Sequence, residues 1–288
     1  MPAPSSSTLP PDTTVGPVEL TVADHDRSRR YYEQTIGLRV LEQAGSRMSL
    51  GVDGTELLAL VEEPGARPAV GHTGLFHFAL LLPDRPSLAR WLAHAGRDRV
   101  PLAGLSDHFV SEAIYLSDPD QHGIEIYADR PRQSWEGQVE AGLTTFPLDV
   151  DALLAELDDP ATEPFEGLPG GTTMGHVHLR VATIPETIAF YRDVLGFDLM
   201  ASLGLRAAFL AAGGYHHHFG ANIWESSGAT PPPPGTAALR QATIVLPDAA
   251  ERDQVAGRVA DAGQEPEAGS DGIAVRDPSG NRLLLAVR

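Results

Sequence analysis

The sequence predicts an α+β protein built from four modules of about 50 residues, each with the element order βαβββ. Two observations predict this class. Residues 74–127 and 239–288 align as rough copies of each other, and both contain an Asp-Pro turn that leads into an apolar strand. Residues 18–24 and 177–183 each read as an alternating strand that passes into an amphipathic helix. The four modules are therefore expected to begin near residues 15, 74, 175 and 239.

The helices of the modules are recognised by their pattern and by their ends. In modules one and three the helical pattern stops at Gly37 and Gly196, and glycine is the usual residue after a helix C-terminus. The four helices are expected at residues 27–33, 88–95, 186–193 and 251–262.

Four modules are enough for two domains. We expect residues 15–130, with modules one and two, to form the first domain, and residues 174–288, with modules three and four, to form the second. Residues 131–173 read as a linker with a short helix at 149–157, whose start is marked by acidic residues. Residues 1–14 are rich in Pro, Ser and Thr and lack an apolar segment, so we expect a disordered tail and not a signal peptide.

Composition excludes several classes of function. The net charge of −18 disfavours nucleic acid and anionic membranes as partners. No stretch approaches the roughly 20 apolar residues that a membrane span needs. The chain has no cysteine, so a disulfide or a thiolate ligand is excluded, and a metal would have to be held by His, Asp or Glu. We expect a soluble cytoplasmic protein.

A histidine and a glutamate distinguish the two aligned copies. Module two carries His77 in its first strand and Glu125 in its last strand, whereas the aligned positions of module four carry Gln241 and Leu284. A lone histidine in an apolar strand is more often a packed core residue, and a strand glutamate more often faces solvent. The pair becomes a candidate metal site only if a third ligand joins it.

Five motifs resemble the vicinal oxygen chelate superfamily, which includes glyoxalases, bleomycin-resistance proteins and extradiol ring-cleaving dioxygenases. The general resemblance lies in the helix-to-glycine segment 190–197 and the Asp-Pro-to-strand segment 118–127, and it extends over residues 15–288. It implies two domains of this superfamily with curved mixed sheets that enclose a metal site. Three further segments are most similar to two-domain bacterial catechol 2,3-dioxygenases, namely residues 107–116, 174–179 and 213–224.

The resemblance implies a ligand set of two histidines and one carboxylate, as in non-haem Fe(II) oxygenases. In the family the ligands lie on the first strands of two paired modules and on the last strand of one. The corresponding first-strand residue is Pro17 in module one, which cannot bind a metal, and His176 in module three, which can. A full set of His77, His176 and Glu125 therefore requires modules two and three to pair, leaving modules one and four as an inert half. Fe(II) is the expected metal, and Mn(II) accepts the same ligands.

The resemblance also assigns catalytic residues. His216, in the Gly-Gly-Tyr-His stretch, matches the position of the family's acid/base histidine. Tyr115, ten residues before Glu125, and His108 match residues that hydrogen-bond the substrate oxygens. Alternation along residues 216–218 predicts that His216, with His218 as the other candidate, points inward.

Three residues are expected to bind substrate. His178 lies two positions after His176 and therefore on the same face of its strand. Asn222 and Trp224 either line the pocket or pack within a strand.

The expected function is an extradiol dioxygenase that uses Fe(II) and O₂ to open a small aromatic diol. Two alternatives remain. A glyoxalase-type isomerase or lyase usually has a second carboxylate ligand, and residues 216–221 contain no Glu. A metal-free binding protein of the bleomycin-resistance kind tends to lack the aligned ligands. The sequence leaves open whether the chain forms a homo-oligomer.

Overall fold

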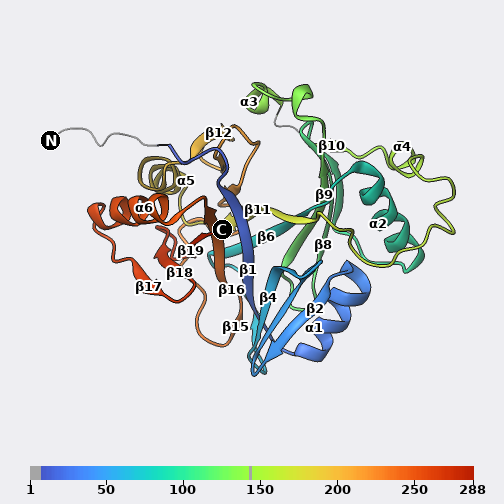
Figure 1. Cartoon of the computed structure of the whole chain (residues 1–288), viewed down its shortest axis with the longest axis horizontal. Helices are drawn as coiled ribbons and strands as arrows, with labels where there is room; N and C mark the ends of the chain where they lie inside the picture. The colour runs from blue at the N-terminus through green and yellow to red at the C-terminus, as the bar shows by residue number, and fades with distance from the viewer. Residues whose placement is uncertain (1–7, 143–144) are drawn as a thin grey trace.

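The structure is a computed structural model that describes residues 8–142 and 145–288. Two large mixed sheets dominate it, and helices cover their outer sides (Figure 1). The predicted α+β class with four βαβββ modules is confirmed. No helix in the described part of the chain is long and apolar enough to cross a membrane.

The first sheet combines modules one and four. Its strands run, in order across the sheet, β17 (Glu267–Gly269), β18 (Gly272–Arg276), β19 (Arg282–Val287), β16 (Leu239–Leu246), β1 (Thr14–Val22), β4 (Thr55–Glu62), β3 (Arg47–Val52) and β2 (Arg39–Ala44). Strands β1 and β16 are antiparallel neighbours and join the two modules.

The second sheet combines modules two and three. Its order is β10 (Phe146–Pro147), β7 (Gly104–Asp107), β8 (Ser111–Ser117), β9 (Gly123–Asp129), β6 (Gly74–Leu81), β11 (Thr173–Arg180), β14 (Phe219–Asn222), β13 (Ala207–Ala211) and β12 (Asp198–Ser202). Two short strands, β5 (Arg67–Pro68) and β15 (Thr236–Ala237), pair separately. The predicted pairing of module two with module three, and of module one with module four, is confirmed.

Strand register confirms the alignment of modules two and four. Glu125 pairs with Ala79, two residues after His77. Leu284 pairs with Thr243, two residues after Gln241. The two modules therefore have the same local architecture, and only module two carries the ligands.

The module helices also repeat in pairs. In modules one and three, α1 (His25–Tyr31) and α5 (Ile184–Ile188) continue into the π-helical segments η1 (Tyr32–Ile36) and η3 (Ala189–Leu195). These end at Gly37 and Gly196, whose φ angles of 96° and 98° confirm the expected glycine termini. The helices of modules two and four are α2 (Arg85–Arg97) and α6 (Ala249–Asp261), each capped by an aspartate side chain.

The linker contains more structure than expected. The predicted helix is present as α4 (Val150–Leu154), with Asp149 as its N-cap. The linker also contributes η2 (Arg132–Ser134), α3 (Val139–Gly142) and the edge strand β10.

The expectation of a disordered tail over residues 1–14 is wrong for its second half, and residues 1–7 lie outside the described residues. Leu9 is buried in the main core, and its N–H donates to the carbonyl of Gly196. Strand β1 begins at Thr14. The Pro-rich composition gave no sign of this one buried apolar side chain, Leu9, which packs against the end of η3.

A buried hydrogen bond joins module one to the turn that precedes β9. The carboxylate of Asp118 accepts the N–H groups of Asp120 and His122 and the hydroxyl of Tyr32 at 2.9 Å. The equivalent bond in modules three and four runs from Tyr191 to Asp277. The helix of one module thus holds the Asp-Pro turn of the next.

We expect Tyr32→Phe to lower the free energy of unfolding by about 1–3 kcal/mol, because it leaves a buried carboxyl group without one of its donors. Urea unfolding measures this loss, provided that the free energy of unfolding falls with urea concentration at the same slope in the variant and in the wild type. Tyr31→Phe is the matched control, since the Tyr31 hydroxyl donates to the carbonyl of Ser117 at an exposed site. Equal losses in the two variants would contradict the interpretation.

Candidate active site

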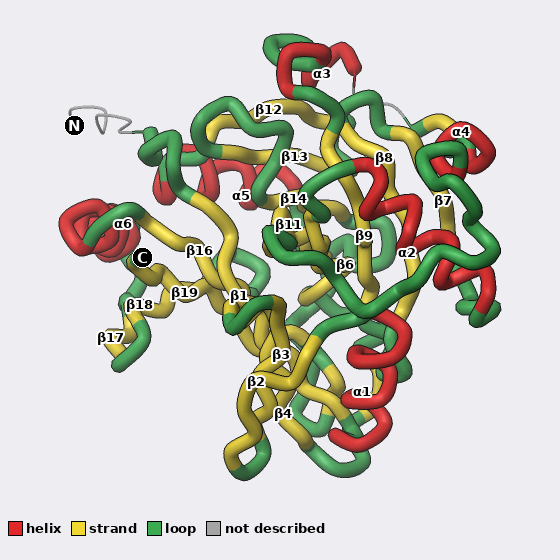
Figure 2. The backbone as a smooth tube through the Cα atoms, turned by 45° about the vertical axis from the view of Figure 1, so that its right-hand side comes forward, coloured by secondary structure: helices red, strands yellow, loops and turns green. Residues whose placement is uncertain are grey.

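Three adjacent strands of the second sheet position the candidate ligands. β6 lies between β9 and β11, and all three run through the middle of the molecule (Figure 2). Along β9, Glu125 alternates with Ile124 and Ile126, which pack in the main core. Strand alternation therefore turns the carboxylate away from the core and toward the opposite face of the sheet.

Two irregularities shape this face. The register between β6 and β11 passes from the pair His77–His178 to the pair Leu75–Leu179, so Phe76 is an extra residue and forms a β-bulge. As a result, both Phe76 and His77 border the same cavity. The second irregularity leaves Gly175 unpaired. A Cβ atom there would lie 1.9 Å from the Tyr127 hydroxyl, so glycine is required.

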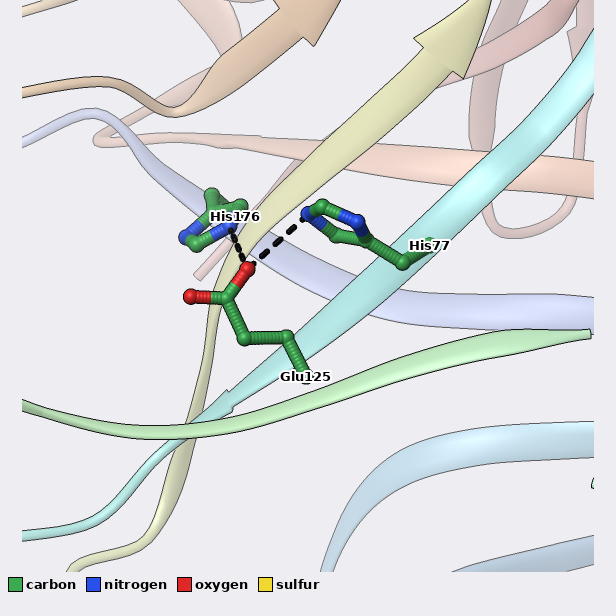
Figure 3. Close-up of side chains that lie close together, drawn as sticks. All are labelled: His77, Glu125 and His176. Atoms are coloured by element: carbon green, nitrogen blue, oxygen red, sulfur yellow. Dashed lines mark hydrogen bonds and ion pairs between the residues drawn. The ribbon is translucent and has the colours of Figure 1, made fainter. Parts of the chain in front are cut away.

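His77, Glu125 and His176 come together as predicted (Figure 3). The Nε2 atoms of His77 and His176 each lie 3.0 Å from Oε2 of Glu125. All three residues are buried. Their donor atoms lie within 4.8 Å of one another, and no other group of this kind occurs in residues 8–142 and 145–288.

This geometry fits a metal ion. Ligands at right angles with bonds of about 2.0–2.2 Å lie about 3 Å from each other, which is the separation of each imidazole nitrogen from the carboxylate oxygen. His77 Nε2 is buried and has no hydrogen-bond partner among the described residues, although Glu125 is near. A buried polar nitrogen without a hydrogen bond is costly, and a metal ion would satisfy it.

Burial sets the protonation of the ligands. It lowers the pKa of His176 and keeps its imidazole neutral, as metal binding requires. Burial alone would raise the pKa of Glu125, but the two imidazoles beside it, His176 first and then His77, hold that pKa well below its usual range. The site therefore presents a carboxylate.

Tyr115 and His108 form a pair next to the ligands. Nε2 of His108 lies 2.7 Å from the Tyr115 hydroxyl, and the rings of Tyr115 and His77 have their centroids 5.5 Å apart. Burial, followed by the charge of Glu125, raises the pKa of Tyr115 well above its usual value. The phenol is therefore neutral and can act as a hydrogen-bond donor or acceptor.

A cavity of about 340 Å³ opens in front of these residues. His178 and Trp224 line it as expected. Gly220, in the neighbouring strand, makes room for the His178 ring, because a Cβ there would lie 2.6 Å from its Nδ1. Asn222 is buried but is not among the lining residues, and its side-chain oxygen accepts the N–H of Trp224 at 3.2 Å. The polar lining residues are His77, Ser106, His108, Ser111, Tyr115, Thr145, Glu125, His178 and His217.

The expected inward orientation of His216 is wrong, because His217 is the member of the triplet that lines the cavity. Residues 212–218 form a loop between β13 and β14, so strand alternation does not apply to them. His216 lies behind, with its Nδ1 2.8 Å from Nδ1 of His217 and its Nε2 2.9 Å from Asp129. His218 accepts the N–H of Ala212 and is not a lining residue either.

Sequence reasoning also missed Asp129 and Phe76. Asp129 was visible as the third member of the alternating set Glu125, Tyr127 and Asp129 on β9. Phe76 had no signal in the sequence, because its position depends on the bulge.

Comparison with known proteins gives the family. The model of the glyoxalase/bleomycin resistance protein/dioxygenase superfamily matches residues 14–126 and 173–285. The chain belongs to this superfamily. It is 43% identical, over 282 residues, to a catechol-2,3-dioxygenase of Bacillus subtilis, a match that covers 96% of this chain and 98% of that protein.

Solved structures with low sequence identity have the same fold. Glyoxalase I from Zea mays is 17% identical, with a TM-score of 0.59, over 96% of this chain and 92% of that one. The cppA protein of Streptococcus pneumoniae is 14% identical, with a TM-score of 0.55, over 96% of this chain and all of that one. These similarities show that the fold of nearly the whole chain recurs in both structures.

We expect one Fe or Mn per chain, because a single ligand set is present in the described residues. His77→Ala, His176→Ala and Glu125→Ala should each lose the metal, as measured by elemental analysis of protein purified without oxygen and with ample iron. Gln241→Ala is the matched control and should keep it, since Gln241 is bonded to Arg282 in the other sheet. Two metals per chain, or none, would disprove this prediction.

Proposed function

We propose that the protein is an extradiol dioxygenase of the catechol 2,3-dioxygenase type, which uses Fe(II), or Mn(II) in its place, and O₂ to open a catechol-like ring. The observation that carries this proposal is the buried His77–Glu125–His176 group at the wall of a cavity. One carboxylate and two imidazoles on one face of a metal leave its other positions for substrate and O₂. The relative of the same length named catechol-2,3-dioxygenase supports the same reaction.

The reaction breaks the ring C–C bond beside the two hydroxylated carbons and inserts both atoms of O₂, yielding a muconic semialdehyde. The bound metal would lower the pKa of the catechol hydroxyls and bring the diol and O₂ together. The protein's own groups would orient the ring and move protons.

Tyr115 and His108 are suited to hold the substrate oxygens. Their 2.7 Å contact leaves the phenol hydroxyl on the cavity wall beside the ligands. A neutral phenol in a buried site can donate to a catecholate oxygen, where a hydrogen bond to a charged acceptor is stronger than a neutral one.

We propose His217 as the acid/base residue, in place of His216, with His216 and Asp129 positioning it. The Asp129 carboxylate can only accept, so Nε2 of His216 carries a proton, and in that tautomer Nδ1 of His216 is an acceptor. Nδ1 of His217 must then donate to it across 2.8 Å. This chain leaves Nε2 of His217 unprotonated, and burial lowers the pKa of His217. His217 can therefore take a proton from the diol and return it later.

A glyoxalase-type isomerase or lyase is the alternative enzyme. Family members of that type usually provide a second carboxylate ligand, and Glu125 is the single carboxylate in the ligand group of the described residues. This donor set favours the dioxygenase.

The test is direct. Protein loaded with Fe(II) under anaerobic conditions should bind catechol and, on exposure to air, consume one O₂ per catechol and form a yellow semialdehyde. Metal-loaded protein that binds catechol but consumes no O₂ would overturn the proposal, and conversion of a hemithioacetal by the same protein would favour the isomerase.

We expect His217→Asn to keep metal and catechol binding, because the amide can still donate to His216 Nδ1. It cannot carry a proton at neutral pH, so ring cleavage should fall by about 10²–10⁴-fold. In His216→Asn the rate of ring cleavage should fall less, by roughly tenfold, because His216 acts only through the orientation of His217. Rapid mixing of the anaerobic catechol complex with O₂ measures both rates. A larger loss in His216→Asn would return the acid/base role to His216.

A further inference from the structure

The charge of the cavity restricts what a substrate can carry. Glu125 is the one carboxylate among its lining residues, and no lysine or arginine lines it within the described part of the chain. Arg180 lies across the Phe76 ring, with its guanidinium 5.6 Å from the ring centroid, and is paired with Glu225 at 3.2 Å. A carboxylate on the ring substituent, away from the metal ligands, would therefore lose water in the cavity without a lysine or arginine to pair with.

The remaining wall is apolar. Phe76 and Trp224 meet edge to face, with ring centroids 5.2 Å apart. Leu203 and Trp224 line the cavity, yet each is 46% exposed, so they form its rim. Large exposed apolar residues at the rim of a cavity indicate a binding surface for an apolar group. The apolar lining residues are Phe76, Val110, Leu203, Phe209 and Trp224.

The cavity is larger than one ring requires. A cavity of roughly 150 Å³ is enough to hold benzene, whereas this one measures about 340 Å³. If the diol binds at the ligands, the remaining space lies toward the apolar wall and the rim. A substituent on the ring would occupy that space.

From the charge of the cavity, its apolar wall and its volume, we propose that the substrates are uncharged catechols with an apolar alkyl or aryl substituent. Leu203 and Trp224 determine this preference. The proposal rests on the ring-cleavage function proposed above. It excludes ring substrates with a carboxylate side chain as preferred substrates. The overall charge of −18 acts in the same direction, because it repels anions from the molecule as a whole.

The experiment compares 4-propylcatechol with 3,4-dihydroxyphenylacetate, which are similar in size and differ in charge, on the Fe(II)-loaded protein. We expect kcat/KM for 4-propylcatechol to be higher by on the order of 100-fold. Anaerobic calorimetry on the Mn(II)-loaded protein measures binding without turnover, and 4-propylcatechol should again bind more tightly than 3,4-dihydroxyphenylacetate. A wild-type preference for the carboxylate would overturn the proposal.

A pair of variants locates the determinant. Leu203→Arg places a cation at the rim. The ratio of kcat/KM for 4-propylcatechol to kcat/KM for 3,4-dihydroxyphenylacetate should therefore fall at least tenfold. Leu205→Arg adds the same charge in the same turn, on a side chain that is 69% exposed and does not line the cavity, and should leave the preference unchanged. If both variants shift the preference equally, general charge and not the rim determines it, and the assignment of Leu203 is wrong.

Unsubstituted catechol separates the two proposals. If the wild-type protein cleaves catechol, the proposed function stands, whatever the result for the substituted rings. If it cleaves neither catechol nor 4-propylcatechol, the proposed function fails, and the calorimetric comparison still decides whether the cavity prefers the apolar ring.

Discussion

The buried carboxylate of Glu125, held between two imidazoles, is the constraint on which the other features of the site depend. A carboxylate without water is strongly unfavourable unless positive or hydrogen-bonding partners surround it. His176 is hydrogen-bonded to it at 3.0 Å, His77 Nε2 approaches it to the same distance, and the two histidines come from strands on opposite halves of the chain. The site can therefore form only if β6, β9 and β11 are neighbours. This requirement selects the sheet that joins module two to module three.

Much of this could be predicted, because the ligands lie on regular strands. The alignment of two copies singled out His77 and Glu125. The family resemblance then gave the positions of the ligands, at which Pro17 cannot bind a metal and His176 can. The same register in modules two and four shows why the alignment was reliable. Repeated backbone geometry makes equivalent positions comparable even where the side chains have diverged.

The errors arose where the backbone is irregular. His216 was expected to face inward by strand alternation, but residues 212–218 form a loop, in which each side chain is placed by its own contacts. Phe76 reaches the cavity through a bulge that one sequence does not reveal. Residues 8–14 were expected to be disordered because composition averages over a segment and misses a single buried side chain such as Leu9.

The half of the protein without ligands braces the half that has them. Several contacts from module one hold the turn that leads into β9, among them Tyr32 to Asp118, Arg27 to Asp120 at 2.6 Å, and the carbonyl of Thr21 to His122 at 2.9 Å. The turn ends at Gly123, two residues before Glu125. Module one therefore supports the candidate site although it carries none of the candidate ligands. A substitution at these contacts, far from the ligands, would therefore reach Glu125 through the strand that carries it.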